Sequence, residues 1–389
     1  MAIHDLSPEY ELIVCCARCQ MDADMSAGIE TLVEGKINWD HLLRSARENH
    51  AIPLLYRHLS DICPGNLPDT VLDQLRQYFN DTVRQNLFQT GELVSLLGLF
   101  ESHAIMAVPL KGPVLGAFFY DNLGIREFSD LDILIQKQDV PQAREILTDR
   151  GYKSIYQMSA SQEAANLCFS QEWLFVHSLY QNYVDLHWCL LSGPSSFLVK
   201  SRDLWGRFET IPFAGTMIRA LSREDLILFL CIHGAKHGWR RLIWICDIAE
   251  LIRYHQEMDW DLIIEKVDVL AVKRVLFLGL FLANNLLGAQ LPEHISRKTK
   301  SDPVIKKLAG KVEEMLFSQI EVLPNANRLF FISSLERWQD KIKYFLMWML
   351  RPNAMDWGGA LSLPVPFYCL TRPLRLFRKY IKRLLKRIF

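Results

Sequence analysis

Two neighbouring stretches decide the fold: Val108-Pro-Leu-Lys-Gly-Pro-Val-Leu-Gly-Ala-Phe-Phe-Tyr120 and Arg126-Glu-Phe-Ser-Asp-Leu-Asp-Ile-Leu-Ile135. In the first stretch, a short apolar run predicts a strand that ends at Lys111-Gly112. Pro113 suits the first turn of a helix, because its missing amide would be unpaired there anyway. The second stretch predicts another strand over 130–135. Strand and helix signals in alternation indicate a compact α/β unit.

The second strand carries two carboxylates on one face. Side chains alternate between the faces of a strand, so Asp130 and Asp132 point the same way while Leu131 and Ile133 point the other. Two like charges about 7 Å apart on an apolar support repel each other unless a cation lies between them. The pattern therefore favours a divalent cation at Asp130 and Asp132.

A third carboxylate comes from the later run Tyr183-Val-Asp-Leu-His-Trp188. There Asp185 and His187 share the polar face of a predicted strand. If Asp185 joins the first two carboxylates, the site can hold two metal ions about 4 Å apart, as in two-metal phosphoryl transfer. Mg²⁺ or Mn²⁺ is the expected cofactor, because hard cations take carboxylate oxygens and share their shell with substrate phosphates.

Phosphate contacts are expected beside this strand. The amides at the helix start after Gly112, together with Lys111, would bind a polyphosphate. Arg126 and Ser129 would add two contacts just before the acidic strand. The alternative for the acidic strand taken alone is a solvated edge with surface acids.

The order of these motifs resembles the nucleotidyltransferase superfamily and, more closely, a bacterial family of uncharacterised nucleotidyltransferases. The matching residues, in order, are Leu110-Lys111-Gly112, Arg126, Asp130-Leu131-Asp132-Ile133-Leu134, Gly151-Tyr152 and Asp185-Leu186-His187-Trp188. The sequence departs from the wider superfamily because Lys111-Gly112-Pro113 stands where Gly-Ser is usual, so a hydroxyl that often contacts a terminal phosphate is missing.

The resemblance implies an α+β fold, with a polymerase-beta-like mixed sheet core and flanking helical segments. It also implies a metal-dependent transfer of an NMP from a nucleoside triphosphate to an unknown hydroxyl-bearing acceptor, with release of pyrophosphate. Asp130 and Asp132 would hold the metals, and Asp185 would share one of them and help deprotonate the acceptor. The candidate nucleotide-binding residues are Lys111, Gly112, Arg126, Ser129, His187, Lys236 and Arg240.

The run after residue 222 adds a polar helix face. His233, Lys236, His237 and Arg240 lie at helical spacing and would close over the nucleotide or the acceptor; the alternative is a solvated helix surface. A zinc site at the two histidines is disfavoured, because Gly234 stands where zinc peptidases carry a catalytic Glu. Asp247, among apolar neighbours, would either pair with Arg240 or Arg241 or face solvent.

Three rival functions remain. A glycosyltransferase could use Asp130 and Asp132 to hold a nucleotide-sugar, although about 100 helical residues precede the strands here. An enzyme that modifies RNA or protein side chains would share the same core. A catalytically inactive nucleotide-binding or interaction protein would keep the fold, but the presence of all three aspartates weighs against it.

The chain of 389 residues predicts several folding units. We expect an N-terminal helical region over 1–103, with one long helix or a kinked pair over 68–103, and a nucleotidyltransferase core over 104–221. A helical domain would follow over 222–350, and a Pro- and Gly-containing linker with a basic amphipathic tail over 351–389. A small hairpin is expected near Ala214-Gly215 and a capping box at Ser222 and Asp225.

Charge and cysteine content indicate which partners and which cellular compartment the protein has. Lys plus Arg equals Asp plus Glu at 44 each, so no global field favours nucleic acid. The nine cysteines lack paired spacing, which favours a reduced cytoplasmic compartment, and Cys16-Ala-Arg-Cys19 suits core packing better than redox chemistry. No transmembrane segment is expected. The basic residues of 372–389 would contact an anionic membrane or an acidic partner, or pack on the acidic remainder of the chain.

Overall fold

A five-stranded mixed sheet forms the centre of the α/β region in a computed structural model that describes residues 6–120, 122–190, 204–318, 325–351 and 371–378. The strand order is β1-β2-β5-β4-β3. Only β2 and β5 pair in parallel, and the other neighbours are antiparallel. The strands are β1 (Ala107–Pro109), β2 (Asp130–Ile135), β3 (Tyr152–Ser154), β4 (Glu172–His177) and β5 (Tyr183–His187).

One face of this sheet is covered by helices. The apolar side chains of β2 that alternate with the aspartates, Leu131 and Ile133, belong to a buried cluster with α5 (Asp69–Ser102) and α7 (Val140–Asp149). Helix α7 ends at Asp149, and Gly151, two residues later, takes the positive φ of 95° that favours glycine. The aspartates consequently lie on the opposite face, toward the C-terminal helices.

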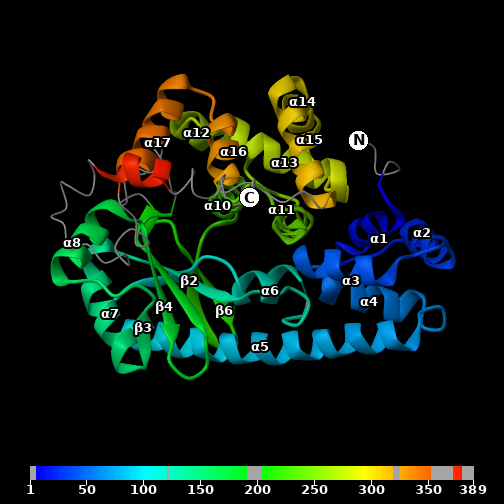
Figure 1. Cartoon of the computed structure of the whole chain (residues 1–389), viewed down its shortest axis with the longest axis horizontal. Coiled ribbons are helices and arrows are strands. Elements are labelled where there is room, and N and C mark those ends of the chain that lie inside the picture. Colours follow the sequence, from blue (N-terminus) through cyan, green and yellow to red (C-terminus); the bar gives the residue numbers. More distant parts are fainter. Residues whose placement is uncertain (1–5, 121, 191–203, 319–324, 352–370, 379–389) are drawn as a thin grey trace.

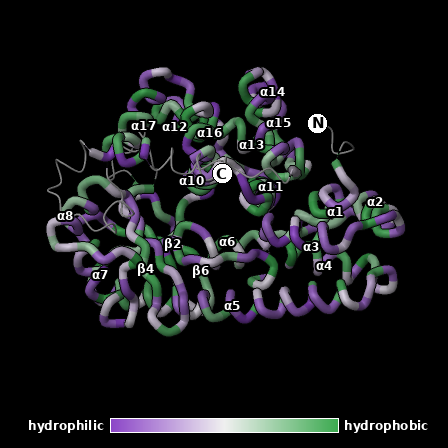
Figure 2. The backbone as a smooth tube through the Cα atoms, viewed as in Figure 1, coloured by the Kyte–Doolittle hydropathy of each residue, from purple (hydrophilic) through white to green (hydrophobic). Residues whose placement is uncertain are grey.

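The N-terminal segment is helical, as predicted. The long apolar pattern forms one continuous helix of 34 residues, α5, rather than a kinked pair. Figure 1 shows α5 running beneath both the sheet and the N-terminal helices, and Figure 2 shows hydrophilic residues along much of its length. The helices that precede it are α1 (Pro8–Cys16), α2 (Ala23–Glu34), α3 (Trp39–Glu48) and α4 (Ile52–Ile62).

The C-terminal half is also helical. A large buried cluster takes apolar residues from α1 to α4 and from the C-terminal helices alike, so these distant segments of the chain share one core. The division into four domains stays a prediction. The helices are α10 (Arg223–Lys236), α11 (Leu242–Tyr254), α12 (Trp260–Leu270), α13 (Lys273–Leu287), α14 (Glu293–Ser301), α15 (Pro303–Phe317), α16 (Ala326–Ser334) and α17 (Trp338–Leu350).

Shorter elements connect these parts. The expected hairpin is present as β6 (Glu209–Phe213) and β7 (Thr216–Ala220), and α6 (Pro113–Phe119) and α8 (Ala160–Phe169) flank the sheet. Ser222 caps α10 by accepting the amide of Asp225. The other half of the predicted box is wrong, since the described cap of α10 consists of the Ser222 bond alone. The Asp225 carboxylate forms an ion pair with Lys266 at 2.9 Å.

The remaining predictions concern cysteines and the tail. Cys16 and Cys19 are buried in the core and form no disulfide, so the core-packing interpretation is confirmed. The described part of the tail is a helix over 371–378, in which Arg372 is buried and Leu374 and Phe377 are exposed. Residues 379–389 lie outside the described part of the chain, as does most of the linker. Among the described helices, none combines the length and the apolar character needed to cross a bilayer.

Candidate functional site

Two adjacent strands bring two of the predicted aspartates together. In the parallel register of β2 and β5, Asp132 lies directly beside Asp185, and Leu134 lies beside His187. The alternation that buries Val184 and Leu186 below the sheet turns Asp185 and His187 to the other face. The strand pairing therefore gathers acidic groups that are more than 50 residues apart in the sequence.

Lys111 lies against both carboxylates of β2. Its Nζ is 2.9 Å from Asp132 Oδ2 and 3.6 Å from Asp130 Oδ2, and its side chain is only 13% exposed. Burial alone would lower the pKa of Lys111, but the charges of Asp132 and Asp130 outweigh it and raise this pKa above its usual range. An ammonium group thus lies against the pair of carboxylates for which the sequence favours a cation.

A glycine makes this placement of Lys111 possible. Gly112 has φ +67°, and a side chain there would approach the Asp130 carbonyl oxygen to 3.4 Å. The tight turn at Gly112 takes the chain from β1 into α6, which begins with Pro113 as predicted. The backbone beside Lys111 consequently packs against the strand that carries the aspartates.

His187 joins the two strands on the same face. Its Nε2 is 3.1 Å from Asp132 Oδ1 and 3.5 Å from Asp185 Oδ2. Burial would lower the pKa of His187, but the neighbouring carboxylates, Asp185 first, outweigh it and raise this pKa to about 9. His187 was predicted to bind nucleotide, and its ring instead faces the carboxylates directly.

The carboxylates of the cluster differ in their electrostatics. Burial raises the pKa of Asp185 to about 7, an effect that His187 opposes and that Glu172 and Asp132 reinforce. Burial acts in the same direction on Asp132, but Lys111 and His187 outweigh it and hold the pKa of Asp132 well below its usual range. Asp185 Oδ1 is buried and receives no hydrogen bond from the described residues.

Glu172 is a fourth acidic group that the sequence reasoning missed. It lies opposite His187 across β4 and β5, and its Oε2 is 3.9 Å from His187 Nδ1 and 3.1 Å from Lys236 Nζ. Lys236 and His187 help hold the pKa of Glu172 low, at about 2. The signal was present, because Glu172 and Leu174 alternate with the buried Trp173 and Phe175.

The polar face of α10 meets the sheet through Lys236 and two histidines. The rings of His233 and His237 are 4.6 Å apart and both contact Trp244 of α11. Burial, reinforced by nearby cations including Lys111 and Lys236, lowers the pKa of both histidines, that of His237 to about 3. Among the described residues, the group that could hold a metal is Asp132, Asp185 and His187. His233, His237 and the predicted ligand Asp130 are outside this group.

Arg126 forms a different cluster from the one the sequence predicted. Its Nε and Nη2 donate to Asp247 Oδ1 and Oδ2 at 2.6 and 2.7 Å, and Tyr120 donates to Oδ1 at 2.7 Å. The Asp247 side chain is 1% exposed and the Arg126 side chain 4% exposed. Pairing of Asp247 with Arg240 or Arg241 is therefore wrong. A phosphate contact by Arg126 loses its basis, since the guanidinium is buried and already bonded in a bidentate pair.

The other candidates lie at the margin of the site. Ser129 is exposed, with its Oγ 3.5 Å from Asp130 Oδ1. Arg240 is exposed beyond the end of α10, and the described part of the chain shows no contact between it and the aspartates. The guanidinium of its neighbour Arg241 packs over Trp244, with Cζ 5.4 Å from the ring centroid, and interacts electrostatically with Asp130. The sequence reasoning did not assign Arg241 to the site.

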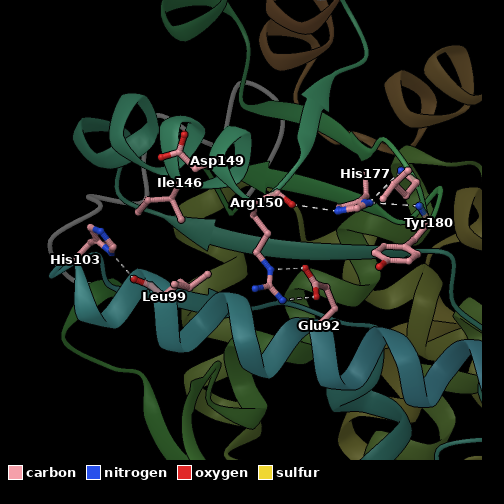
Figure 3. A pocket seen from close by; sticks show the side chains of 9 residues that line it. Glu92, Leu99, His103, Ile146, Asp149, Arg150, His177 and Tyr180 are labelled. Carbon is pink, nitrogen blue, oxygen red and sulfur yellow. Dashed lines mark hydrogen bonds and ion pairs between the residues drawn. The ribbon is translucent and has the colours of Figure 1, made fainter.

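A separate pocket of about 560 Å³ lies on the side of the sheet covered by α5 and α7. Figure 3 shows the ion pair between Arg150 and Glu92 across it, with His177 and Tyr180 beside them. Its two main charged groups already neutralise each other, and none of the four carboxylates described above lines it. The candidate site is therefore the face toward α10.

Comparison with known proteins gives one family. A sequence profile described as "Uncharacterised nucleotidyltransferase" matches residues 35–288. This range contains both acidic strands, Lys111 and the histidine-bearing helix α10. No curated protein matches the sequence significantly.

Proposed function

Because the chain belongs to the family of uncharacterised nucleotidyltransferases, we propose that it transfers an NMP from a nucleoside triphosphate to a hydroxyl-bearing acceptor and releases pyrophosphate. Membership of this family supports nucleotidyl transfer in general. The reactants, the metal and the roles of individual residues belong to the proposal.

One observation carries the proposal more than any other. Asp132 and Asp185 are register neighbours on parallel strands, and Lys111 Nζ lies within 3.6 Å of carboxylate oxygens of both Asp130 and Asp132. Acidic groups on one sheet face beside a buried cation suit a reaction in which charge on phosphate oxygens must be bound and redistributed.

The residues present fit a divalent metal ion. The buried Asp185 Oδ1 receives no hydrogen bond within the described chain, so this oxygen retains ligand capacity. Asp132 and Asp185 would hold the ion, and Asp130, which lies outside the group of Asp132, Asp185 and His187, would join them after a side-chain rearrangement. Mg²⁺ and Mn²⁺ both accept such oxygen ligands. When bound, the ion supplies positive charge to the phosphates and increases the acidity of an acceptor hydroxyl.

The chain's own residues would bind the triphosphate and take up the proton of the acceptor. Lys111 would turn its ammonium from the carboxylates to the triphosphate, and the backbone at Gly112 allows a close approach because no side chain intervenes. Asp185 would accept the proton of the acceptor hydroxyl at a carboxylate oxygen. Lys236, which forms an ion pair with Glu172, would add positive charge beside the phosphates. Ser129 and Arg240 stay weaker candidates at the rim.

The rival functions differ in their donor and in their carboxylate requirement. A glycosyltransferase would use the same acidic strand to hold a nucleotide-sugar. An inactive binding protein would need none of the buried acidic oxygens that this site retains. The family match favours nucleotidyl transfer over both.

Label transfer tests the proposal. The full chain is incubated with each α-³²P-labelled triphosphate, Mg²⁺ or Mn²⁺ and a cell extract, and in parallel with a ¹⁴C-labelled nucleotide-sugar. We expect ³²P to become covalently attached to one acceptor class, in one or more of the triphosphate reactions. Transfer of sugar, with no transfer from any triphosphate, would establish the glycosyltransferase function instead.

A further inference from the structure

We infer that His187 ligates the metal through Nε2, so that the site prefers a transition-metal ion such as Mn²⁺ over Mg²⁺. This inference rests on the proposed function only for the presence of a metal at the aspartates. It replaces the nucleotide-binding role that the sequence suggested for His187.

The first argument is the position of the His187 ring. Nε2 lies 3.1 Å from Asp132 Oδ1 and 3.5 Å from Asp185 Oδ2, on the side of the ring that faces both carboxylates. The three ligand atoms lie within 4.8 Å of one another. They come from three positions of the same sheet face, because Asp132 pairs with Asp185 and Leu134 pairs with His187 across β2 and β5.

These separations suit ligands on one ion. With metal–ligand bonds of about 2.1 Å, two ligands at right angles are about 3.0 Å apart, and two ligands at a tetrahedral angle are about 3.4 Å apart. The distances from Nε2 to the two carboxylate oxygens therefore require little rearrangement. Coordination needs the neutral imidazole, so binding of the ion at Nε2 would release a proton from a protonated ring.

The opposite side of the ring faces a carboxylate that lies beyond hydrogen-bond distance. Metal-bound histidines usually direct their second nitrogen toward a carboxylate that orients the ring. Here Nδ1 faces Glu172, with 3.9 Å between Nδ1 and Oε2. Lys236 holds the same Oε2 at 3.1 Å, so Glu172 is fixed between the ring and α10. A shortening of the distance between Nδ1 and Oε2 on metal binding would make Glu172 a positioning residue for His187.

A nitrogen ligand changes which metal the site selects. Oxygen-only sites suit Mg²⁺, whereas an imidazole adds affinity for transition metals. Mn²⁺ accepts both carboxylate and imidazole and can bind the phosphates as well. The set of Asp132, Asp185 and His187 therefore favours Mn²⁺ over Mg²⁺.

Electron spin-echo spectroscopy of Mn²⁺ tests the inference without any reaction. The full chain is freed of metal and loaded with MnCl₂ alone, and ¹⁴N modulation from a directly bound imidazole is recorded. We expect the modulation in the wild type, its loss in His187→Asn, and its retention in His237→Gln, a matched control from the neighbouring histidine pair. Circular dichroism and thermal melting confirm that the variants are folded.

Metal selectivity gives an independent reading. Competition between Mn²⁺ and Mg²⁺ is measured by the Mn²⁺ spin signal, and His187→Asp is compared with the wild type. We expect the Mn²⁺ preference to fall about tenfold or more, because the variant offers only oxygen ligands. An unchanged preference would overturn the inference.

The other outcomes separate this inference from the proposed function. Tight Mn²⁺ binding without ¹⁴N modulation in the wild type would overturn the role of His187 and leave a carboxylate-held metal. Mn²⁺ binding that is absent from the wild type, or equally strong in Asp132→Asn and Asp185→Asn, would overturn both the ligand role and the metal site on which the proposed function depends.

Discussion

Two buried charge clusters, both contacting the segment between β1 and β2, are built on opposite principles. In the first, Arg126 and Asp247 form a bidentate pair, and Tyr120 donates to the same carboxylate. In the second, Asp132 and Asp185 lie side by side, and Lys111 and His187 are their ion-pair partners in the described part of the chain. The first cluster is complete, whereas Asp185 in the second has a buried oxygen that receives no hydrogen bond from the described chain.

The difference distinguishes a structural role from a functional one. A buried ion pair whose hydrogen bonds are all made fixes two elements together, here the segment before β2 and α11. A buried cluster with excess acid is costly for the folded chain, and it suits a role in which a cation or substrate completes it. The predictions below test this contrast.

The largest expected effect is on activity in the incomplete cluster. Asp185→Asn should reduce nucleotidyl transfer at least about 10³-fold, equivalent to about 4 kcal/mol of transition-state stabilisation. The free energy of unfolding should stay level or rise. Burial raises the pKa of Asp185 to about 7, so its ionised form is unfavourable in the fold and a neutral amide avoids that cost. Label transfer and urea denaturation measure the two quantities, and a large loss of stability would contradict this assignment.

Substitution in the complete cluster of Arg126 and Asp247 should mainly reduce stability rather than activity. Arg126→Met leaves the Asp247 carboxylate buried without its cation and should lower the free energy of unfolding by about 3 to 5 kcal/mol. The double variant Arg126→Met with Asp247→Leu removes both charges and should recover part of that loss. Urea denaturation of the single and double variants checks this prediction. Equal stability of all three proteins would show that the pair is not structural.

Lys111 has both a structural and a functional aspect. It is a buried cation that stabilises the fold, and the metal should partly replace its charge. Lys111→Met should destabilise the metal-free chain by roughly 2 kcal/mol, less than loss of the fully buried pair. Mn²⁺ should raise the melting temperature of this variant more than that of the wild type, since the ion supplies the missing positive charge. An equal shift in both proteins would show that Lys111 and the metal do not share the carboxylates.

The smallest effect concerns the basic tail, whose contact with a membrane or an acidic partner stays a prediction. In the described helix over 371–378, Leu374 and Phe377 are exposed while Arg372 is buried. Vesicles of mixed neutral and anionic lipid are sedimented with the full chain and with a chain truncated after residue 370. We expect a few-fold weaker pelleting of the truncated chain. Equal pelleting would argue for packing on the chain itself.

Local patterns predicted most of the elements that position the site. Alternation in β2 and β5 indicated which side chains share a face, and Gly112-Pro113 indicated where α6 begins. These inferences succeed because they depend on neighbours in the sequence. The placement of Asp185 beside Asp132 needed the strand pairing, which the family resemblance implied and the register shows.

The missed features all depend on contacts between distant segments. Asp247 lies 121 residues from Arg126, so no local spacing pointed to their pair, and Arg126 looked like a free phosphate ligand. Glu172 gained its importance only when β4 paired with β5 and α10 brought Lys236 over the sheet. Long polar side chains are assigned poorly from sequence because burial and a partner, rather than residue type, decide their role.

The most direct test of the contrast is the initial rate of ³²P transfer per folded molecule in two variants, Asp185→Asn and the double variant Arg126→Met with Asp247→Leu. We predict that the first loses transfer while remaining stable, and that the second retains most of its transfer at a temperature where it is folded. The account is contradicted if Asp185→Asn retains ³²P transfer while the folded double variant loses it. That result would place the chemistry at Arg126 and Asp247.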